Sequence, residues 1–294
     1  MGDAMDRLPA ARRFVRRFVA GPALEDALGV AARLNADGVD AAITHLGENV
    51  VTIADASRAA DAYLEVLDET ARRRLRAVPS LKLTHLGLDL GNDVCRANLE
   101  RVAARGFTAR TLVWIDMESS AYTDRTLDLY GRLHPTYSNL ACVVQSYLRR
   151  TEQDVEGLIE IGATVRLCKG AYREPPQLAF PDKRDVDLSY ARSLDRLLSA
   201  DALARGVYPA FATHDERLIG RTREQARAGG VAADRYEVQM LYGIRHDMHA
   251  PLRSAGLRLR VLVPYGEDWY GYFMRRLAER PANLAFFFRQ VIRG

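Results

Sequence analysis

The stretch LACVVQSYLRRTEQDVEGLIEIGATVRLCK, residues 140–169, contains the unit from which the fold can be predicted. An apolar strand over 140–146 is followed by an amphipathic helix over 152–161 and by a second apolar strand over 163–169. Near-continuous apolar strands joined through a helix are typical of parallel strands that are covered on both faces. This stretch therefore predicts one strand–helix–strand unit of a parallel sheet with helices outside it.

The same unit recurs along the whole chain. Predicted strands lie at 41–46, 80–86, 111–117, 140–146, 163–169, 208–213, 236–241 and 257–263. Predicted helices lie at 23–36, 54–77, 92–106, 121–133, 152–161, 186–204, 215–228, 247–255 and 266–280. Eight such strands alternating with helices predict an α/β protein of the (β/α)8 TIM-barrel type with extra N-terminal helices.

We expect one domain over the full 1–294, because no linker or change of composition divides the chain. It would comprise N-terminal helices over 1–38, the barrel over 39–280 and an apolar C-terminal segment over 281–294. In such barrels the chemistry lies at the carboxyl ends of the strands. The irregular loop 174–187 follows the richest of these ends, which indicates a lid or substrate loop.

Composition excludes several classes of function. The net charge of +4 is spread over the predicted helices rather than gathered in one stripe, so a nucleic-acid partner is not expected. No apolar run reaches the roughly 18 residues that span a bilayer, and residues 1–20 lack the apolar core of a secretion signal, so we expect a cytoplasmic protein. Metal-type His or Cys spacing is missing from the sequence, so no metal site is expected. A Walker loop and Gly-x-Gly-x-x-Gly are also missing, so a nucleotide kinase or a Rossmann enzyme lacks support.

Two clusters of polar residues could carry chemistry. Arg166-Leu-Cys-Lys-Gly-Ala-Tyr172 places two cations, a glycine and a tyrosine at a strand end, which suits an anionic ligand or an electron-rich ring. The alternative is that Arg166 and Lys169 pair with neighbouring carboxylates and only support the fold. On the last helix, Tyr272, Arg275, Arg276 and Glu279 lie three or four residues apart on overlapping faces, where adjacent arginines can hold a carboxylate.

Single polar residues at other strand ends complete the candidate set. Lys82 stands among apolar strand residues, where an ammonium group needs an anion. Asp116 ends the third strand, Gln145 the fourth, and His214 follows the sixth. A lone histidine in that position can equally be structural.

Taken in order, these motifs resemble those of proline dehydrogenase, a flavin-dependent barrel family, over about residues 31–284. The most specific parts are Arg166–Tyr172 and Tyr272-x-x-Arg-Arg-x-x-Glu279, supported by Lys82, Asp116 and Gln145. The resemblance implies non-covalent FAD at the carboxyl end of the barrel. Arg166 would lie against the flavin N5 region, and the other cofactor contacts would be Met117, Gln145, Lys169, Gly170, Ala171, Thr213 and His214.

The resemblance also implies a substrate site. Lys82, Arg275 and Arg276 would bind the carboxylate of L-proline, and Tyr172, Leu241 and Tyr272 would surround its ring. Asp116 would support the cationic groups and Glu279 would brace the arginine pair. A hydride from C5 would pass to flavin N5, giving Δ1-pyrroline-5-carboxylate. Electrons would then pass to a quinone-type acceptor, which implies peripheral contact with the inner membrane.

One position departs from the family pattern. Two residues before Pro264 the family usually has a tyrosine that helps to exclude hydroxylated rings, and here it is Leu262. A dehydrogenase of a proline analogue, such as a hydroxyproline, an N-alkyl proline or a ring homologue, is therefore an alternative. Two further alternatives are a Schiff-base lyase that uses Lys82 or Lys169, and a catalytically silent FAD-binding scaffold.

Overall fold

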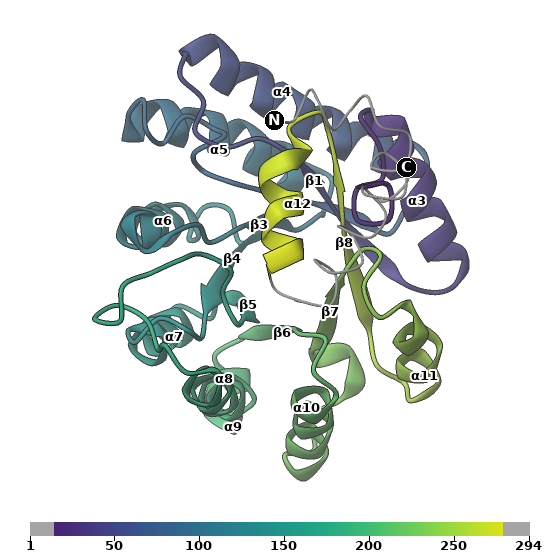
Figure 1. The fold of residues 1–294 in the computed structure, drawn as a ribbon, viewed down its shortest axis with the longest axis vertical. Helices are drawn as coiled ribbons and strands as arrows, with labels where there is room; N and C mark the ends of the chain where they lie inside the picture. Colours follow the sequence, from purple (N-terminus) through teal and green to yellow (C-terminus); the bar gives the residue numbers. More distant parts are fainter. Residues whose placement is uncertain (1–14, 279–294) are drawn as a thin grey trace, which may run out of the picture.

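The computed structural model describes residues 15–278, with the side chains of 276–278 left out. Eight parallel strands form a closed barrel in which each strand pairs with its neighbours in sequence and the last pairs with the first, as predicted (Figure 1). The strands are β1 (Asp40–His45), β2 (Ala77–Leu81), β3 (Val113–Ile115), β4 (Leu140–Gln145), β5 (Thr164–Cys168), β6 (Tyr208–Ala212), β7 (Glu237–Leu241) and β8 (Leu259–Tyr265).

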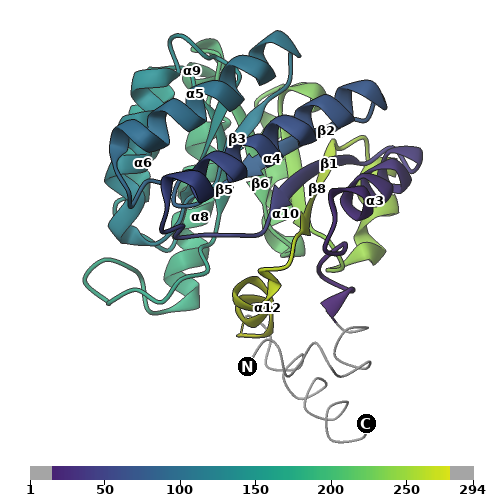
Figure 2. The same ribbon diagram turned by 90° about the horizontal axis from the view of Figure 1, so that it is seen from above.

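Helices surround the barrel on its outer side, except the last one, which lies across one end (Figures 1 and 2). They are α3 (Leu24–Ala36), α4 (Ile53–Arg72), α5 (Asn92–Thr108), α6 (Ser120–Leu133), α7 (Thr151–Glu160), α8 (Lys183–Leu197), α9 (Ala200–Ala204), α10 (Glu216–Ala228), α11 (His249–Ser254) and α12 (Trp269–Ala278), with short 3₁₀ turns η1 (Ala233–Arg235) and η2 (His246–Met248). Within residues 15–278 no helix combines the length and apolarity needed to cross a membrane.

Several predicted boundaries were wrong. The helix predicted over 54–77 ends at Arg72, and the strand predicted from residue 80 already begins at Ala77. The third strand, predicted over 111–117, covers only Val113–Ile115. The second strand ends at Leu81 rather than at residue 86, because Leu83, Leu86 and Leu88 are buried in successive turns rather than alternating along a strand. The predicted helix 186–204 starts at Lys183 and divides into α8 and α9. The loop predicted over 174–187 therefore ends earlier, because α8 begins at Lys183.

The barrel interior is polar at both ends. Arg260 donates to both carboxylate oxygens of Glu237, at 2.8 and 3.0 Å, near the amino ends of the strands. Both side chains are almost fully buried, so each charge needs the other. The outward faces of the strands pack with the helices into one apolar core that includes Ile43 and Val261. This closed framework holds the strand ends in fixed positions around the mouth.

The helix α12 lies across one end of the barrel, as the two views together show (Figures 1 and 2). It follows β8, so this end carries the carboxyl termini of the strands. The segment before α3 forms hydrogen bonds with the connection between β8 and α12. Ala20 N–H donates to the Pro264 carbonyl at 2.8 Å, and Gly266 N–H donates to the Gly21 carbonyl at 2.9 Å. Phe18 also packs near Phe273 of α12, with ring centroids 6.2 Å apart. The chain thereby fastens α12 over the mouth.

Candidate active site

A cleft of about 290 Å³ opens between α12 and the ends of β1 and β2. Its lining residues come from three separate parts of the chain and are Leu46, Gly47, Glu48, Lys82, Asp268, Tyr270, Gly271, Tyr272 and Arg275. Three of these, Lys82, Tyr272 and Arg275, are predicted site residues. The fold thus brings together the two motifs that lie farthest apart among the predicted substrate contacts.

Glu48 lies between the two cations of this cleft. The Lys82 ammonium donates to Glu48 Oε2 at 2.6 Å, and the Arg275 guanidinium donates to both Glu48 oxygens at 3.1 and 3.3 Å. Burial raises the pKa of Glu48, but Lys82 and then Arg275 lower it further, to about 2. The two cations therefore already hold a carboxylate. The sequence prediction missed Glu48, although its position directly after a strand end was a usable signal.

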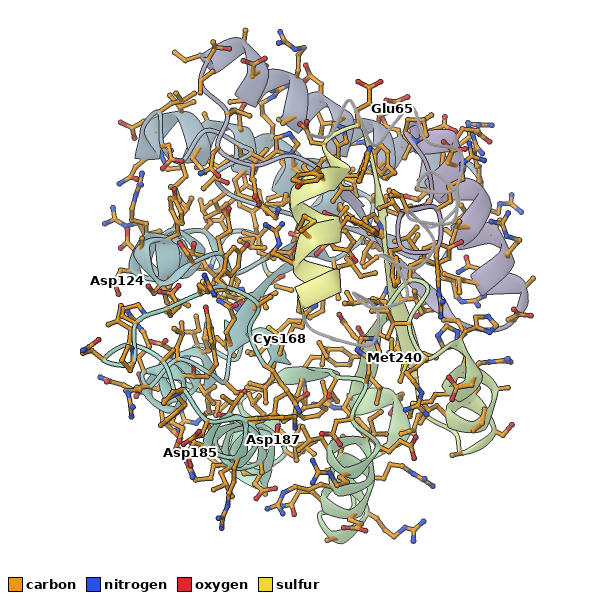
Figure 3. All side chains as sticks on the ribbon, viewed as in Figure 1. Glu65, Asp124, Cys168, Asp185, Asp187 and Met240 are labelled. Carbon is orange, nitrogen blue, oxygen red and sulfur yellow. The ribbon has the colours of Figure 1, made fainter. Side chains whose placement is uncertain are left out.

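Replacement of Glu48 by glutamine should lower KM for a carboxylate substrate roughly fivefold, because a competing, partly exposed ion pair worth about 1 kcal/mol is removed. Steady-state kinetics would measure this. Glu65→Gln, on the exposed side of α4, is the control and should leave KM unchanged. Figure 3 labels Glu65 near the outer edge of the molecule. A KM that rises in Glu48→Gln would contradict competition.

The same variant should change the dependence of stability on pH. The pKa of Glu48 lies below its ordinary value of 4.5, so its contribution is present above that value and is lost as pH falls toward 2. Thermal unfolding should show the natural chain as more stable than Glu48→Gln at neutral pH, with the difference shrinking across this acid range.

Arg166 lies deep in the barrel, where its side chain is only 6% exposed. Its Nη1 donates to Asp116 Oδ1 at 2.7 Å and to Ser80 Oγ at 3.1 Å. The guanidinium also stacks on the buried ring of Trp114, with Cζ 4.3 Å from the ring centroid. Burial lowers the pKa of Arg166, and Asp116 opposes this effect. Asp116 therefore contacts a candidate cation, as a supporting residue should.

The remaining donors of Arg166 suit an electron-rich ligand. Its buried Nε and Nη2 have no hydrogen-bond partner among the described residues. A buried donor without an acceptor costs about 1–3 kcal/mol, so a ligand that accepts from this open fork would be favoured. A flavin ring edge, which carries acceptor atoms, fits this donor set.

The chain turns at Gly170, two residues after β5 ends at Cys168. Gly170 has a φ of +111°, and a side-chain carbon there would lie 2.2 Å from the Tyr147 ring, so only glycine fits. Lys169 is paired, at 2.6 Å with Asp187 and at 3.2 Å with Asp215. In Figure 3, Cys168 lies near the middle of the barrel and Asp187 on α8. The structural interpretation of Lys169 is thus present in the geometry, and its cofactor role stays a prediction.

Buried polar contacts position the neighbouring strand ends. Glu118, whose pKa is raised by burial, accepts from Thr84 N–H at 3.0 Å and from Thr84 Oγ1 at 2.6 Å, two residues beyond Lys82. Gln145 donates to the Glu118 carbonyl at 2.8 Å. These contacts tie the loops after β2, β3 and β4 together. Met117, which lies between Asp116 and Glu118 in the sequence, is almost fully buried.

The aromatic and aliphatic candidates lie around the cleft. Tyr172 lies under the Arg275 guanidinium, with Cζ 5.5 Å from the ring centroid. Tyr272 is buried in an apolar cluster against which Leu241 packs. Leu262 is the partly exposed residue within an otherwise buried β8, and it pairs in register with Leu241. These residues could form an apolar wall beside the cations.

The remaining predicted residues lie directly after β5 and β6 or outside the described part of the chain. Thr213 is buried and accepts from Asp215 N–H at 3.1 Å, while His214 Nε2 accepts from Leu241 N–H at 3.0 Å. His214 thus makes a structural contact, and its cofactor role stays a prediction. Ala171 lies in the loop after β5. The Arg276 side chain and all of Glu279 lie outside the described part of the chain.

Comparison with known proteins shows the family to which the chain belongs. A family model described as proline dehydrogenase matches residues 27–289. The chain is 37% identical to proline dehydrogenase 2 of Bacillus subtilis subsp. natto over 93% of this chain and 88% of that protein. It is 36% identical to proline dehydrogenase of Deinococcus radiodurans over 95% of this chain and 90% of that protein.

A solved structure shares the fold. Proline utilization A from Bdellovibrio bacteriovorus, inactivated by N-propargylglycine, superposes with a TM-score of 0.84 at 23% identity. The match covers 91% of this chain and 32% of that longer chain. This likeness concerns the barrel fold.

Proposed function

The chain belongs to the proline dehydrogenase family and is an oxidoreductase that acts on proline in the first step of proline catabolism, and we propose that it does so with FAD and yields Δ1-pyrroline-5-carboxylate. Enzymes of this family depend on a flavin. The single observation that carries the proposal is the ionic contact of Lys82 and Arg275 with a carboxylate at the barrel mouth.

The chain's own cations would orient the substrate. Lys82 and Arg275 face one carboxylate position from opposite sides, since both contact the Glu48 carboxylate. A proline carboxylate that takes over these contacts would fix the ring beside Tyr172 and Tyr272. Holding the reacting groups in one orientation can lower the activation free energy by several kcal/mol. Arg276 would add a third cation.

Arg166 would supply the matching electrostatics on the cofactor side. The flavin, when bound, provides the acceptor for the hydride from C5. The open donors of Arg166 would stabilise the negative charge that accumulates there, while Asp116 and Ser80 keep the guanidinium in place. Met117, Gln145, Lys169, Gly170, Ala171, Thr213 and His214 are the other proposed cofactor contacts.

The substrate nitrogen needs no dedicated base in this proposal. Transfer of the amine from water into the cleft disfavours its charged form, and the nearby Lys82 and Arg275 disfavour it further. The amine would therefore lose its proton on binding, and the neutral nitrogen can then assist departure of the hydride.

We also propose a cytoplasmic enzyme that passes electrons to a quinone-type acceptor through peripheral contact with the inner membrane. The N-terminal residues before 15 and the apolar segment 281–294, which are the proposed contact regions, lie outside the described residues. The proposed single-domain division, with helices over 1–38 and the barrel over 39–280, is compatible with α3 lying outside the barrel.

The test is the visible spectrum of the purified protein before and after anaerobic addition of L-proline. A flavin spectrum that bleaches with proline supports the proposal. A flavin that proline does not bleach would indicate a scaffold, and a colourless protein trapped by borohydride with a keto substrate would indicate the lyase.

Leu262 favours a second candidate, a dehydrogenase of a proline analogue. A leucine here, in register with Leu241, leaves an apolar wall without the hydroxyl group of the family's tyrosine. Leu262→Tyr should therefore raise the ratio of kcat/KM for proline to that for 4-hydroxyproline roughly tenfold, since pocket contacts of this size discriminate by about 10–200-fold. Proline being a poorer substrate than 4-hydroxyproline or pipecolate would favour the second candidate, and an unchanged ratio in the variant would remove Leu262 from ring selection.

A further inference from the structure

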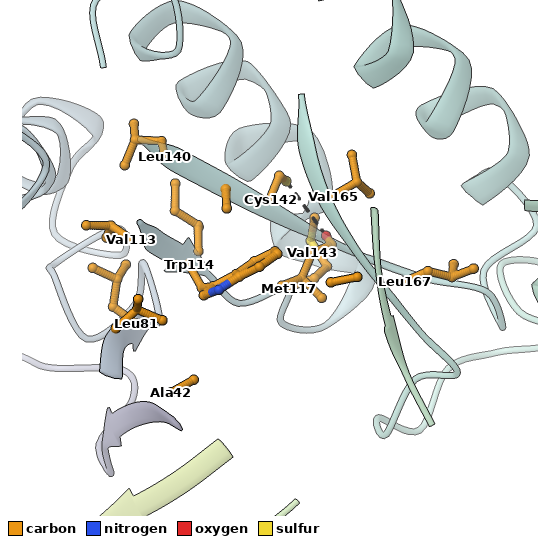
Figure 4. Close-up of a cluster of buried hydrophobic side chains, with 14 of the residues drawn as sticks. Ala42, Leu81, Val113, Trp114, Met117, Leu140, Cys142, Val143, Val165 and Leu167 are labelled. Carbon is orange, nitrogen blue, oxygen red and sulfur yellow. Dashed lines mark hydrogen bonds between the residues drawn. The ribbon is translucent and has the colours of Figure 1, made fainter. Parts of the chain in front are cut away.

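Trp114 is a tryptophan inside the barrel rather than in the layer between strands and helices. Trp114 of β3 and Asp116, directly after that strand, are two residues apart, and both contact Arg166. The Trp114 side chain is fully buried, and its indole N–H has no acceptor among the described residues. Figure 4 draws the indole among Leu81, Val143 and Met117. A buried indole N–H without an acceptor costs free energy of folding, so apolar packing alone does not account for a tryptophan beside this guanidinium.

The polar contacts of Arg166 leave its orientation incompletely determined. Asp116 and Ser80 both accept from the same nitrogen, Nη1. Contacts at one nitrogen act as a hinge about which the planar group can tilt. A flat ring against the face of the plane removes that freedom, and the face of tryptophan attracts a cation more strongly than other rings do.

The strand order makes this contact long-range. Arg166 pairs in register with Val143 of β4, and Trp114 lies on the far side of that strand, on β3. The guanidinium therefore reaches across the inner face of β4 to meet the indole. This leaves the fork of Nε and Nη2 open, the two donors that have no partner among residues 15–278.

We propose that Trp114 is a positioning residue that holds the plane of Arg166 so that its open fork faces the flavin. The proposal rests on the proposed function, because it assigns Trp114 a role in the same cofactor site. Loss of the ring face would let Arg166 tilt, and the reduced, negatively charged flavin would be less stabilised. The reduction potential of the bound flavin would then fall.

The experiment compares Trp114→Phe with Trp114→Leu in the full chain with bound flavin. Both variants remove the indole and leave a cavity, but only phenylalanine retains an aromatic face. The equilibrium constant for flavin reduction should be on the order of tenfold lower in Trp114→Leu than in Trp114→Phe. For a two-electron couple this corresponds to a potential about 30 mV more negative. Thermal unfolding should show similar losses of stability in the two variants.

Each outcome decides the proposal. Equal potentials in the Phe and Leu variants would mean that Trp114 only fills space. If Trp114→Leu does not hold flavin, Trp114→Met replaces it as the aliphatic variant. Loss of flavin from both aliphatic variants but not from Trp114→Phe would support the role of the ring, and loss from all three would overturn it. A natural chain that contains no flavin would contradict the proposed function itself, which distinguishes the two failures.

Discussion

Replacement of Arg166 by methionine is expected to lower kcat by about 10²–10³-fold, the usual cost of removing one preorganised donor from a site of developing negative charge. The variant loses the charge, the open fork and the stacking on Trp114 together, and it leaves Asp116 without its cation. Anaerobic stopped-flow measurement of flavin bleaching at saturating proline would isolate this step from substrate binding.

Arg260→Met is the matched control for this prediction. Arg260 is as buried as Arg166 and is also paired with a carboxylate, that of Glu237, but it lies near the amino ends of the strands, away from the mouth. Both variants should lose stability, because each leaves a carboxylate without its partner. Only Arg166→Met should lose kcat per folded, flavin-loaded molecule. Equal losses of kcat in both would mean that Arg166 supports the fold and does not take part in the chemistry.

Replacement of Arg275 by methionine should raise KM for proline by roughly 30-fold or more, because it removes one of the cations proposed to hold the substrate carboxylate, and truncating one partner of such a charge pair costs about 2–5 kcal/mol. The guanidinium is 21% exposed, and it lies beside both Glu48 and Tyr172. In the variant, Lys82 would still be held by Glu48 and would be less available to the substrate. Steady-state kinetics with a dye acceptor would measure the change, with kcat altered less than KM.

Two further variants sharpen this result. Arg58→Met removes an exposed arginine that is paired on the surface of α4, and it should leave KM unchanged. In the double variant Glu48→Gln with Arg275→Met, Lys82 is released from its competing carboxylate, so part of the lost affinity should return. A KM for Arg275→Met equal to that of the natural chain would make this arginine a surface feature.

Much of the fold was predictable because its signals are local. Each strand is a continuous apolar run that ends in polar residues, and each such unit can be recognised within about thirty residues. The prediction failed where local patterns are ambiguous. The run from Leu81 to Leu86 has apolar residues that suit a strand or a buried turn, and only packing against α5, through Cys95 and Asn98, selects the turn.

The sequence by itself determined the barrel, the end of it that carries the site, and the residue types available there, because periodicity and strand-end chemistry depend on neighbours along the chain. Only the tertiary structure decided which of those residues meet. Glu48 and Arg275 are 227 residues apart, and Arg166 reaches Asp116 over 50 residues. No local pattern encodes such pairings, since they arise when the closed barrel brings all eight strand ends to one mouth. The roles of Glu48 as a competing carboxylate and of Trp114 as the surface under Arg166 follow from that closure.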